Sequence, residues 1–171
     1  FLSLSLTAQL NTANWFYNDT SGSGIQSYPH NIASGLYSIS IGHYTEASGG
    51  YSTAMGYNTI ASGDQSTAMG YNTTAFGTYS TSMGYNTTAS GLYATAMGSY
   101  TTASGKGATV VGLSTTASGD RSTAMGRNTT ASDYLSLVIG QYNSSGSSVT
   151  NSATDFNTAN TAFVIGNGVN S

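Results

Sequence analysis

A 14-residue repeat runs through most of the sequence and limits the folds open to it. Eight consecutive units begin at Ser38, Ser52, Ser66, Ser80, Ala94, Ala108, Ser122 and Ser136. The fifth residue of every unit is Gly, and the tenth is Ala in the first seven units. The twelfth residue is Gly from Gly49 to Gly119, and Asp133 ends that column. A fixed period kept in register over eight units indicates a repeat architecture.

Within each half of the unit, small residues alternate with larger or more polar ones. A period of two is typical of strands. A Gly every seven residues disfavours helices, because each interior Gly costs about 1 kcal/mol relative to Ala. Collagen is excluded because its Gly recurs at every third residue. The pattern predicts an all-β parallel roll, or solenoid, whose 14-residue coils each hold two strands of about five residues. Corners such as Tyr71-Asn72 and Thr78-Tyr79 join the strands.

The face of small residues is predicted to point into the roll, because a coil of 14 residues encloses little space. The outer face of the second strand, with Thr74 as an example, is mostly polar and is predicted to meet water. The predicted roll interior comprises Ala54, Gly56, Ala61, Gly63, Ala68, Gly70, Ala75, Gly77, Ala96, Gly98, Ala103 and Gly105.

A column of larger apolar residues is predicted to project from the outer face of the first strand. This methionine column comprises Ile41, Met55, Met69, Met83, Met97, Val111, Met125 and Ile139. A continuous exposed apolar stripe usually marks an interface, and a closed cyclic assembly would bury it. We predict that the column packs against the same column of symmetry-related chains. The alternative is that these side chains fill a slightly wider core.

Units that read Ser-Thr-Ala-Met-Gly-Tyr-Asn-Thr-Thr-Ala-Ser-Gly resemble the head repeats of YadA-like trimeric autotransporter adhesins. The resemblance covers Ala33 to about Ser145 and includes both the period and the paired half-pattern. It implies a left-handed parallel β-roll with three chains per head. Similar repeats also occur in phage and bacterial fibre proteins. The tail from Ala162 to Gly168 resembles the closing segment of such heads.

The chain is predicted to have four regions, one of which is the repeats. Residues 1–9 are interpreted as the remnant of a signal peptide, or alternatively as a first strand with alternating Leu and Ser. Residues 10–31, with the aromatic cluster at Trp15, are predicted to cap the roll, with an aromatic ligand-binding tip as the alternative. Residues 32–145 form the repeats. Residues 146–171 are predicted to be an irregular segment and a closing strand before a neck or a further module.

The composition argues against several functions. Charged residues make up 5% of the chain, and the only basic ones are Lys106, Arg121 and Arg127, so we expect no nucleic-acid partner. The absence of Cys excludes disulfides and thiolate metal sites. No apolar run is long enough to span a membrane, so we expect contact with a membrane only through regions outside this chain.

Titratable residues do not converge in the way that catalysis requires. The histidines are His30 and His43, and neither recurs in register. Asp64 and Asp120 share a repeat position, but four coils separate them by ~19 Å. We therefore predict no enzyme, no catalytic or metal site and no cofactor.

Tyrosines at the corners of the coils are predicted to form ladders along the edges of the roll. Tyr57, Tyr71, Tyr79, Tyr85 and Tyr93 are possible contacts for a surface ligand, since a tyrosine combines a flat apolar ring with a hydroxyl. The alternative is that these rings stack on one another.

Together, the repeat and the resemblance predict a non-enzymatic adhesin head. We expect a secreted homotrimeric rod at the bacterial cell surface, held to the outer membrane by an anchor beyond this chain. Its partner would be an extracellular matrix protein or a surface glycan. One alternative is a phage or virion tail-fibre segment that binds a bacterial glycan. A minor alternative is an ice-binding solenoid, based on the column Thr74, Thr88, Thr102, Thr116 and Thr130 beside Ser90, Ser104, Ser118 and Ser132.

Overall fold

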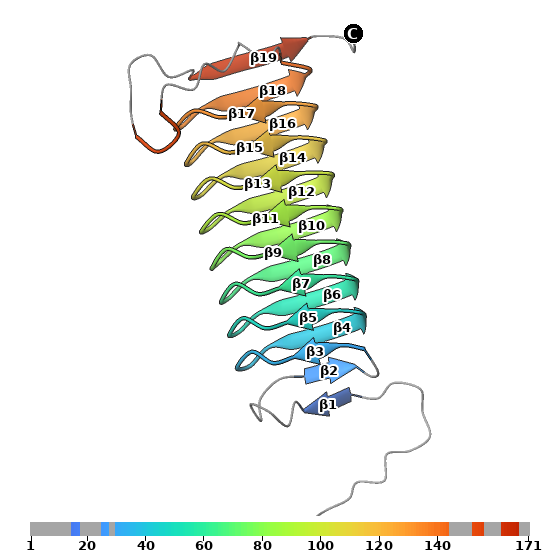
Figure 1. The fold of residues 1–171 in the computed structure, drawn as a ribbon. Coiled ribbons are helices and arrows are strands. Elements are labelled where there is room, and N and C mark those ends of the chain that lie inside the picture. Colours follow the sequence, from blue (N-terminus) through green and yellow to red (C-terminus); the bar gives the residue numbers. More distant parts are fainter. Residues whose placement is uncertain (1–14, 18–24, 28–29, 144–151, 156–161, 168–171) are drawn as a thin grey trace, which may run out of the picture.

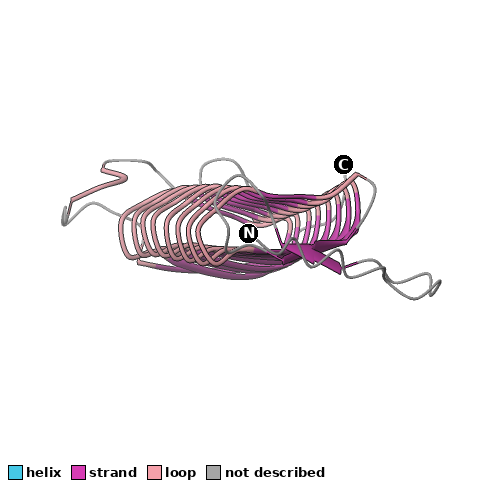
Figure 2. Cartoon of the chain, turned by 90° about the horizontal axis from the view of Figure 1, so that it is seen from below, coloured by secondary structure: helices cyan, strands magenta, loops and turns pink. Residues whose placement is uncertain are grey.

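The chain folds into a rod of stacked coils, shown in Figure 1. The computed structural model describes residues 15–17, 25–27, 30–143, 152–155 and 162–167. Seen along the rod, successive coils overlie one another as flattened loops (Figure 2). Every regular element in the described residues is a strand, and the repeats pair in parallel. The predicted all-β parallel solenoid of 14-residue coils is therefore confirmed.

The first strands of the coils form an 11-stranded sheet. All its neighbouring strands are parallel except β1 and β2. In the repeats, each strand residue lies opposite the residue 14 positions away in the neighbouring strand, so that Met83 lies opposite both Met69 and Met97. The strands, in sheet order, are β1 (Trp15–Tyr17), β2 (Ile25–Ser27), β4 (Ile39–His43), β6 (Thr53–Tyr57), β8 (Thr67–Tyr71), β10 (Thr81–Tyr85), β12 (Thr95–Ser99), β14 (Thr109–Leu113), β16 (Thr123–Arg127), β18 (Leu137–Gln141) and β19 (Phe163–Asn167).

The second strands form an 8-stranded parallel sheet and are two residues long, shorter than predicted. The N–H groups of Ser62 and Gly63 both donate to the carbonyl of Ala75, at 3.0 and 3.2 Å, so regular pairing ends after each Ala. The strands are β3 (Ile32–Ala33), β5 (Glu46–Ala47), β7 (Ile60–Ala61), β9 (Thr74–Ala75), β11 (Thr88–Ala89), β13 (Thr102–Ala103), β15 (Thr116–Ala117) and β17 (Thr130–Ala131).

The predicted corners are confirmed by the backbone angles. Asn72 and Tyr79 have φ values of 52° and 60°, in the left-handed region that allows a sharp change of direction. Their N–H groups donate to the carbonyls of Tyr57 and Asp64 in the preceding coil, at 2.9 and 2.8 Å. Hydrogen bonds between coils therefore continue around both corners.

The close approach of consecutive coils accounts for both glycine columns, and the predicted interior is wrong for one of them. A Cβ at Gly77 would lie 2.0 Å from the carbonyl oxygen of Gly91, so this buried column is fixed by the close approach of consecutive coils. The first-strand glycines meet the next coil as closely, since a Cβ at Gly70 would lie 2.1 Å from the carbonyl oxygen of Gly84. They also have positive φ, 126° at Gly70, which interrupts the alternation of the strand. As a result, Gly70 and Gly98 are exposed and Gly56 is half-buried, whereas the other residues predicted inside are buried.

The interior combines small apolar residues with hydroxyls. The fully buried apolar residues include Ala68, Ala96, Val110 and Val138. The eighth residue of the first seven units, Thr in every case, is also buried. Where the third residue is Ser, the pair is satisfied: Ser40 with Thr45 and Ser82 with Thr87 share hydrogen bonds of 2.6 and 2.7 Å between their hydroxyls. Where it is Ala or Val, the threonine hydroxyl has no partner in the described residues; these are Thr59, Thr73, Thr101, Thr115 and Thr129.

Asparagine side chains make hydrogen bonds at both ends of the second sheet, and the one at the C-terminal end caps it. Asn31 and Asn143 occupy the eighth position before and after the seven threonines. The Oδ1 of Asn143 accepts from the N–H of Thr130 at 2.7 Å, and its Nδ2 donates to the Thr130 carbonyl at 3.0 Å. At the other end, the Oδ1 of Asn31 accepts from the N–H of Thr45 at 2.9 Å. The amide of Asn143 thus takes hydrogen bonds that a further strand would supply, which limits the exposed strand edge. Asn31 instead directly precedes the terminal strand β3 and joins it to the next coil.

The stack begins earlier than the repeat pattern indicates. β2 lies within the predicted cap, but it pairs in parallel with β4, with Ile25 opposite Ile39. The antiparallel β1 then lies at the end of the first sheet. The predicted signal-peptide remnant, residues 1–9, and most of the predicted irregular segment fall outside the described residues.

Candidate assembly and binding surfaces

The methionine column lies on the outer face of the 11-stranded sheet. The parallel register places each member beside the next, as with Met55, Met69 and Met83. Met97 and Met125 are 38% and 40% exposed, and the other six members are half-buried. None of the eight is part of the buried core, because each alternates with an inward-pointing residue such as Ala68. The isolated rod therefore carries a continuous, partly exposed apolar stripe.

The stripe is longer and wider at its C-terminal end than the sequence prediction stated. β19 pairs in register with β18, which places Ile165 beside Ile139 and Phe163 beside Leu137. Ile165 is 66% exposed and Phe163 is 54% exposed. The first-strand signature Val164-Ile165-Gly166 could have extended the column to Ile165. Phe163 and Leu137 occupy the second position of the unit, where most coils have Thr.

The outer face of the 8-stranded sheet carries hydroxyls. Thr88, Thr102 and Thr116 are paired in register with one another, and the column continues to Thr74 and Thr130. The seryl residues two positions later, Ser90, Ser104 and Ser118, are exposed. Phe76, which is also exposed, takes the place of serine in one coil. We call the surface formed by Thr88, Ser90, Thr102, Ser104, Thr116 and Ser118 the hydroxyl face.

Aromatic rings stack along one edge of the rod. The rings of Tyr57 and Tyr71 have centroids 5.0 Å apart and planes 7° apart, and Tyr71 and Tyr85 follow at 5.2 Å and 11°. His43 extends this Tyr57 ladder at its N-terminal end, stacked on Tyr57 at 5.3 Å. The three tyrosine rings stack because each occupies the same position in consecutive coils.

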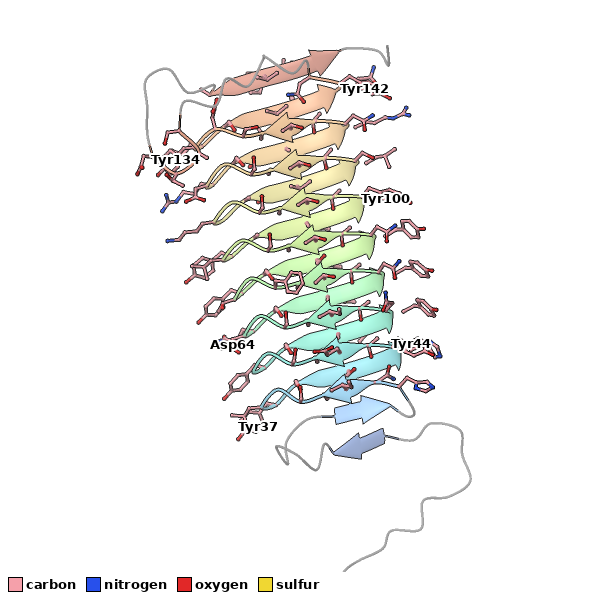
Figure 3. The ribbon with its side chains drawn as sticks, viewed as in Figure 1. Tyr37, Tyr44, Asp64, Tyr100, Tyr134 and Tyr142 are labelled. Carbon is pink, nitrogen blue, oxygen red and sulfur yellow. The ribbon has the colours of Figure 1, made fainter. Side chains whose placement is uncertain are left out.

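The other two candidate tyrosines lie on the opposite edge, so the five do not form one patch. Tyr79 and Tyr93 stack at 5.0 Å with planes 16° apart. Figure 3 shows aromatic side chains along both edges, with Tyr37 labelled on one edge and Tyr44 and Tyr100 on the other. Stacked rings cover each other's faces, so within each stack they turn mainly their edges and hydroxyls to solvent. This arrangement disfavours sugar binding on open tyrosine faces within the ladder.

Tyr85 is distinguished by its contact with Tyr100. Their rings meet edge to face at 5.4 Å. A hydrogen bond with the side chain of Tyr100 is the main cause that raises the pKa of the Tyr85 phenol, followed by the charge interaction with Tyr100. Tyr85 therefore holds its proton to higher pH than an isolated tyrosine would.

Some of the few charged residues connect neighbouring coils. The carboxylates of Asp64 and Asp120 accept from the N–H groups of Gly50 and Lys106, at 2.9 and 2.8 Å. The guanidinium of Arg121 donates to the Tyr134 hydroxyl at 2.7 Å. Within the described ranges, no three His, Cys, Asp or Glu residues gather in a way that could hold a metal ion. Nor does any helix there have the length and apolar character to cross a membrane.

The family model for the YadA head domain repeat matches residues 33–59, 61–87, 77–101, 89–115, 103–129 and 117–142. These matches cover the coils described above and more than half of the chain. The chain belongs to the YadA head repeat family. YadA-type heads are adhesin modules of trimeric autotransporters, exposed at the cell surface and typically without enzymatic activity. Among curated proteins, none matches the chain.

Proposed function

We propose that this YadA-type head forms a homotrimeric rod that attaches its cell to host tissue, matrix or neighbouring cells. The observation that carries the proposal is the division of the rod surface in a chain of this family. One outer face holds an unbroken apolar stripe, and the opposite outer face and both edges hold hydroxyls and aromatic rings.

The methionine column is the proposed seam between the three chains. Full burial of a Met side chain is worth about 1.5–3 kcal/mol, and these side chains are only partly buried in the single rod. Three identical stripes meeting around one axis would remove the remaining apolar surface from water. The register-matched stripes also favour a closed arrangement, because every coil offers the same chemistry at the same height.

Attachment would then depend on many weak contacts. The hydroxyl face and the tyrosine edges repeat the same groups from coil to coil, and with 5% charged residues they offer little long-range attraction. A partner rich in hydroxyls or amides, such as a surface glycan or a matrix protein, fits this chemistry. Three chains and several coils would multiply the individual contacts, since linked sites raise avidity by about 100-fold or more. Regions outside this chain would hold the head at the outer membrane.

The proposal can be tested by measuring binding to matrix proteins and to glycan arrays. The native head would be compared with a Met69→Asp, Met83→Asp, Met97→Asp variant that cannot assemble, at equal chain concentration. We expect binding by the native head that falls by about 100-fold or more in the variant. We also expect no single substitution on the hydroxyl face to abolish binding. Equal binding by a folded monomer, or no binding by an assembled trimer, would contradict the proposal.

A further inference from the structure

The stacked tyrosines form pairs whose separation is set by the coil spacing. Tyr57, Tyr71 and Tyr85 end three neighbouring strands and are opposite one another in the sheet register. On the other edge, Tyr79 and Tyr93 are related by the same 14-residue step. We propose that these tyrosines are sites of oxidative cross-linking, at which hydrogen peroxide activated by a haem peroxidase joins consecutive coils through dityrosine.

Three features of the pairs favour this reaction. The ring centroids lie 5.0–5.2 Å apart with planes within 7–16° of each other, so the partner is held in place before any radical forms. The rings are exposed, from 42% at Tyr57 and Tyr71 to 54% at Tyr93, so an oxidant reaches them from solvent. Exposed side chains also retain the rotational freedom needed to bring two ring carbons into contact.

The chemistry is balanced by one molecule of peroxide for each cross-link. Each tyrosine gives up its phenolic hydrogen as one proton and one electron, which leaves two phenoxyl radicals. The radicals couple through one carbon–carbon bond between the ring positions next to the hydroxyls. Each bonded carbon then loses its hydrogen while its own oxygen regains one, and both rings become aromatic again. The peroxide takes up two electrons and two protons and is released as two molecules of water.

Other tyrosines of the rod have different partners. The guanidinium groups of Arg121 and Arg127 lie over the rings of Tyr134 and Tyr142, at 5.6 and 5.5 Å. In the part of the chain that the structure describes, neither tyrosine has a ring contact with a second tyrosine. These two half-buried tyrosines therefore provide an internal control for the loss of two phenols that have no tyrosine partner.

A dityrosine bond would act as a covalent staple between coils. Residues 57 and 71, like residues 79 and 93, are one coil apart, so each cross-link closes a loop of one repeat. A closed loop restricts the unfolded chain and thereby favours the folded rod. A head at the cell surface would become more resistant to unfolding when it meets peroxide. This inference rests on the coil geometry and does not depend on which ligand the head binds.

The test uses two matched double variants of the whole chain. Tyr71→Phe with Tyr93→Phe removes the partner from every near-parallel tyrosine pair, and phenylalanine keeps the ring stacking. Tyr134→Phe with Tyr142→Phe removes the same number of tyrosines and leaves these pairs intact. Each protein is treated with horseradish peroxidase and hydrogen peroxide. Dityrosine fluorescence and intact mass are then measured on single chains recovered from a denaturing gel.

For the native chain and the Tyr134/Tyr142 variant, we expect dityrosine fluorescence and a loss of two hydrogens per cross-link, together with a higher midpoint of thermal unfolding. The Tyr71/Tyr93 variant should lose most of this signal. A residual signal is expected from the tyrosine pairs that this variant leaves in place but that are not near-parallel. These are Tyr37 with Tyr51 at 5.1 Å and 33°, Tyr85 with Tyr100 at 5.4 Å and 71°, and Tyr44 with Tyr57 at 6.3 Å and 84°. Equal yields in the two variants would overturn the proposal, and so would cross-links found only between chains.

Discussion

The two outer faces of the rod share one 14-residue period but differ in chemistry. The first-strand face presents Met69, Met83 and Met97 in register, whereas the second-strand face presents Thr74, Thr88 and Thr102 from the same three coils. Both faces cover the same narrow interior of Ala, Ser and Thr. The difference between them therefore does not come from the needs of the core.

This comparison separates residues that make the solenoid from residues that use it. Small inward residues and the glycine columns allow the coils to stack, and a change there is felt by both faces. The outward columns have no such restriction, so their composition reflects what each face contacts. An apolar column favours a permanent partner of the same kind, and a hydroxyl face favours water or a polar ligand.

The largest effect is expected from placing charges on one face and then on the other. Met69→Asp, Met83→Asp and Met97→Asp together should abolish assembly, because an unpaired charge buried at an interface costs about 3–5 kcal/mol. The matched control is Thr74→Asp, Thr88→Asp and Thr102→Asp, which introduces the same repulsion in the same coils. We expect the control to remain assembled by light scattering. Loss of assembly in both variants would remove the distinction between the faces.

A second substitution tests whether both faces depend on the spacing of the coils. In Gly77→Ala, the new Cβ would lie 2.0 Å from the Gly91 carbonyl oxygen, so we expect a loss of about 3 kcal/mol, at the upper end of overpacking costs. Gly50→Ala is the control, because its Cβ would meet the nearest atom, Oδ1 of Asp64, at 3.5 Å. Urea unfolding compares the two. A stable Gly77→Ala protein would mean that the coils are free to separate.

A third substitution alters the interior and leaves both faces unchanged. In Ala68→Ser, the new hydroxyl should pair with that of Thr73, as Ser82 pairs with Thr87 at 2.7 Å. We expect a gain of about 1 kcal/mol in the free energy of unfolding, the usual net value of one hydrogen bond. The reverse change, Ser82→Ala, should lose a similar amount. Thermal unfolding of both variants measures the difference, and an unchanged midpoint in both would show that the hydroxyl pair is without effect.

The smallest effect is expected at the edge between the two faces. The pKa of Tyr85 is raised chiefly by its hydrogen bond with Tyr100, so Tyr100→Phe should lower the pKa of Tyr85 toward its ordinary value. Because folding raises the pKa of Tyr85, its neutral phenol favours the folded state at pH values below the ordinary pKa of tyrosine. This contribution is lost as the pH rises through the raised pKa of the folded state. Ultraviolet titration of the phenols, with Tyr134→Phe as control, detects the shift. An unchanged titration would exclude the hydrogen bond as its cause.

Much of the fold could be predicted from the sequence because the period is so regular. The alternation of small and larger residues predicted the inward-pointing alanines, and the residues at the corners predicted the turns at Asn72 and Tyr79. The exposed Gly70 could not be placed, because its positive φ interrupts the alternation on which the prediction relied. The length of the second strands could not be predicted either, because it depends on two N–H groups that share the Ala75 carbonyl.

The ends of the rod were harder to predict than its middle. β2 was not predicted, because the segment from Ile25 to Ser27 lacks the small residues of the repeat. Its pairing with β4 in the structure identifies it as a strand of the stack. Asn31 and Asn143 do occupy the position of the threonine column, and this position could have suggested a different role for them. The surfaces were predicted as columns, but the sequence did not indicate whether the tyrosine rings would stack or offer open faces.

The molar mass of the chain in solution tests the central claim most directly. Light scattering behind a sizing column should give a β-rich species of three times the 17.4 kDa chain, with the methionine column buried between its members. A folded, β-rich species with the mass of one chain would contradict the account. It would mean that the rod tolerates its apolar stripe in water and that the two outer faces do not divide assembly from binding.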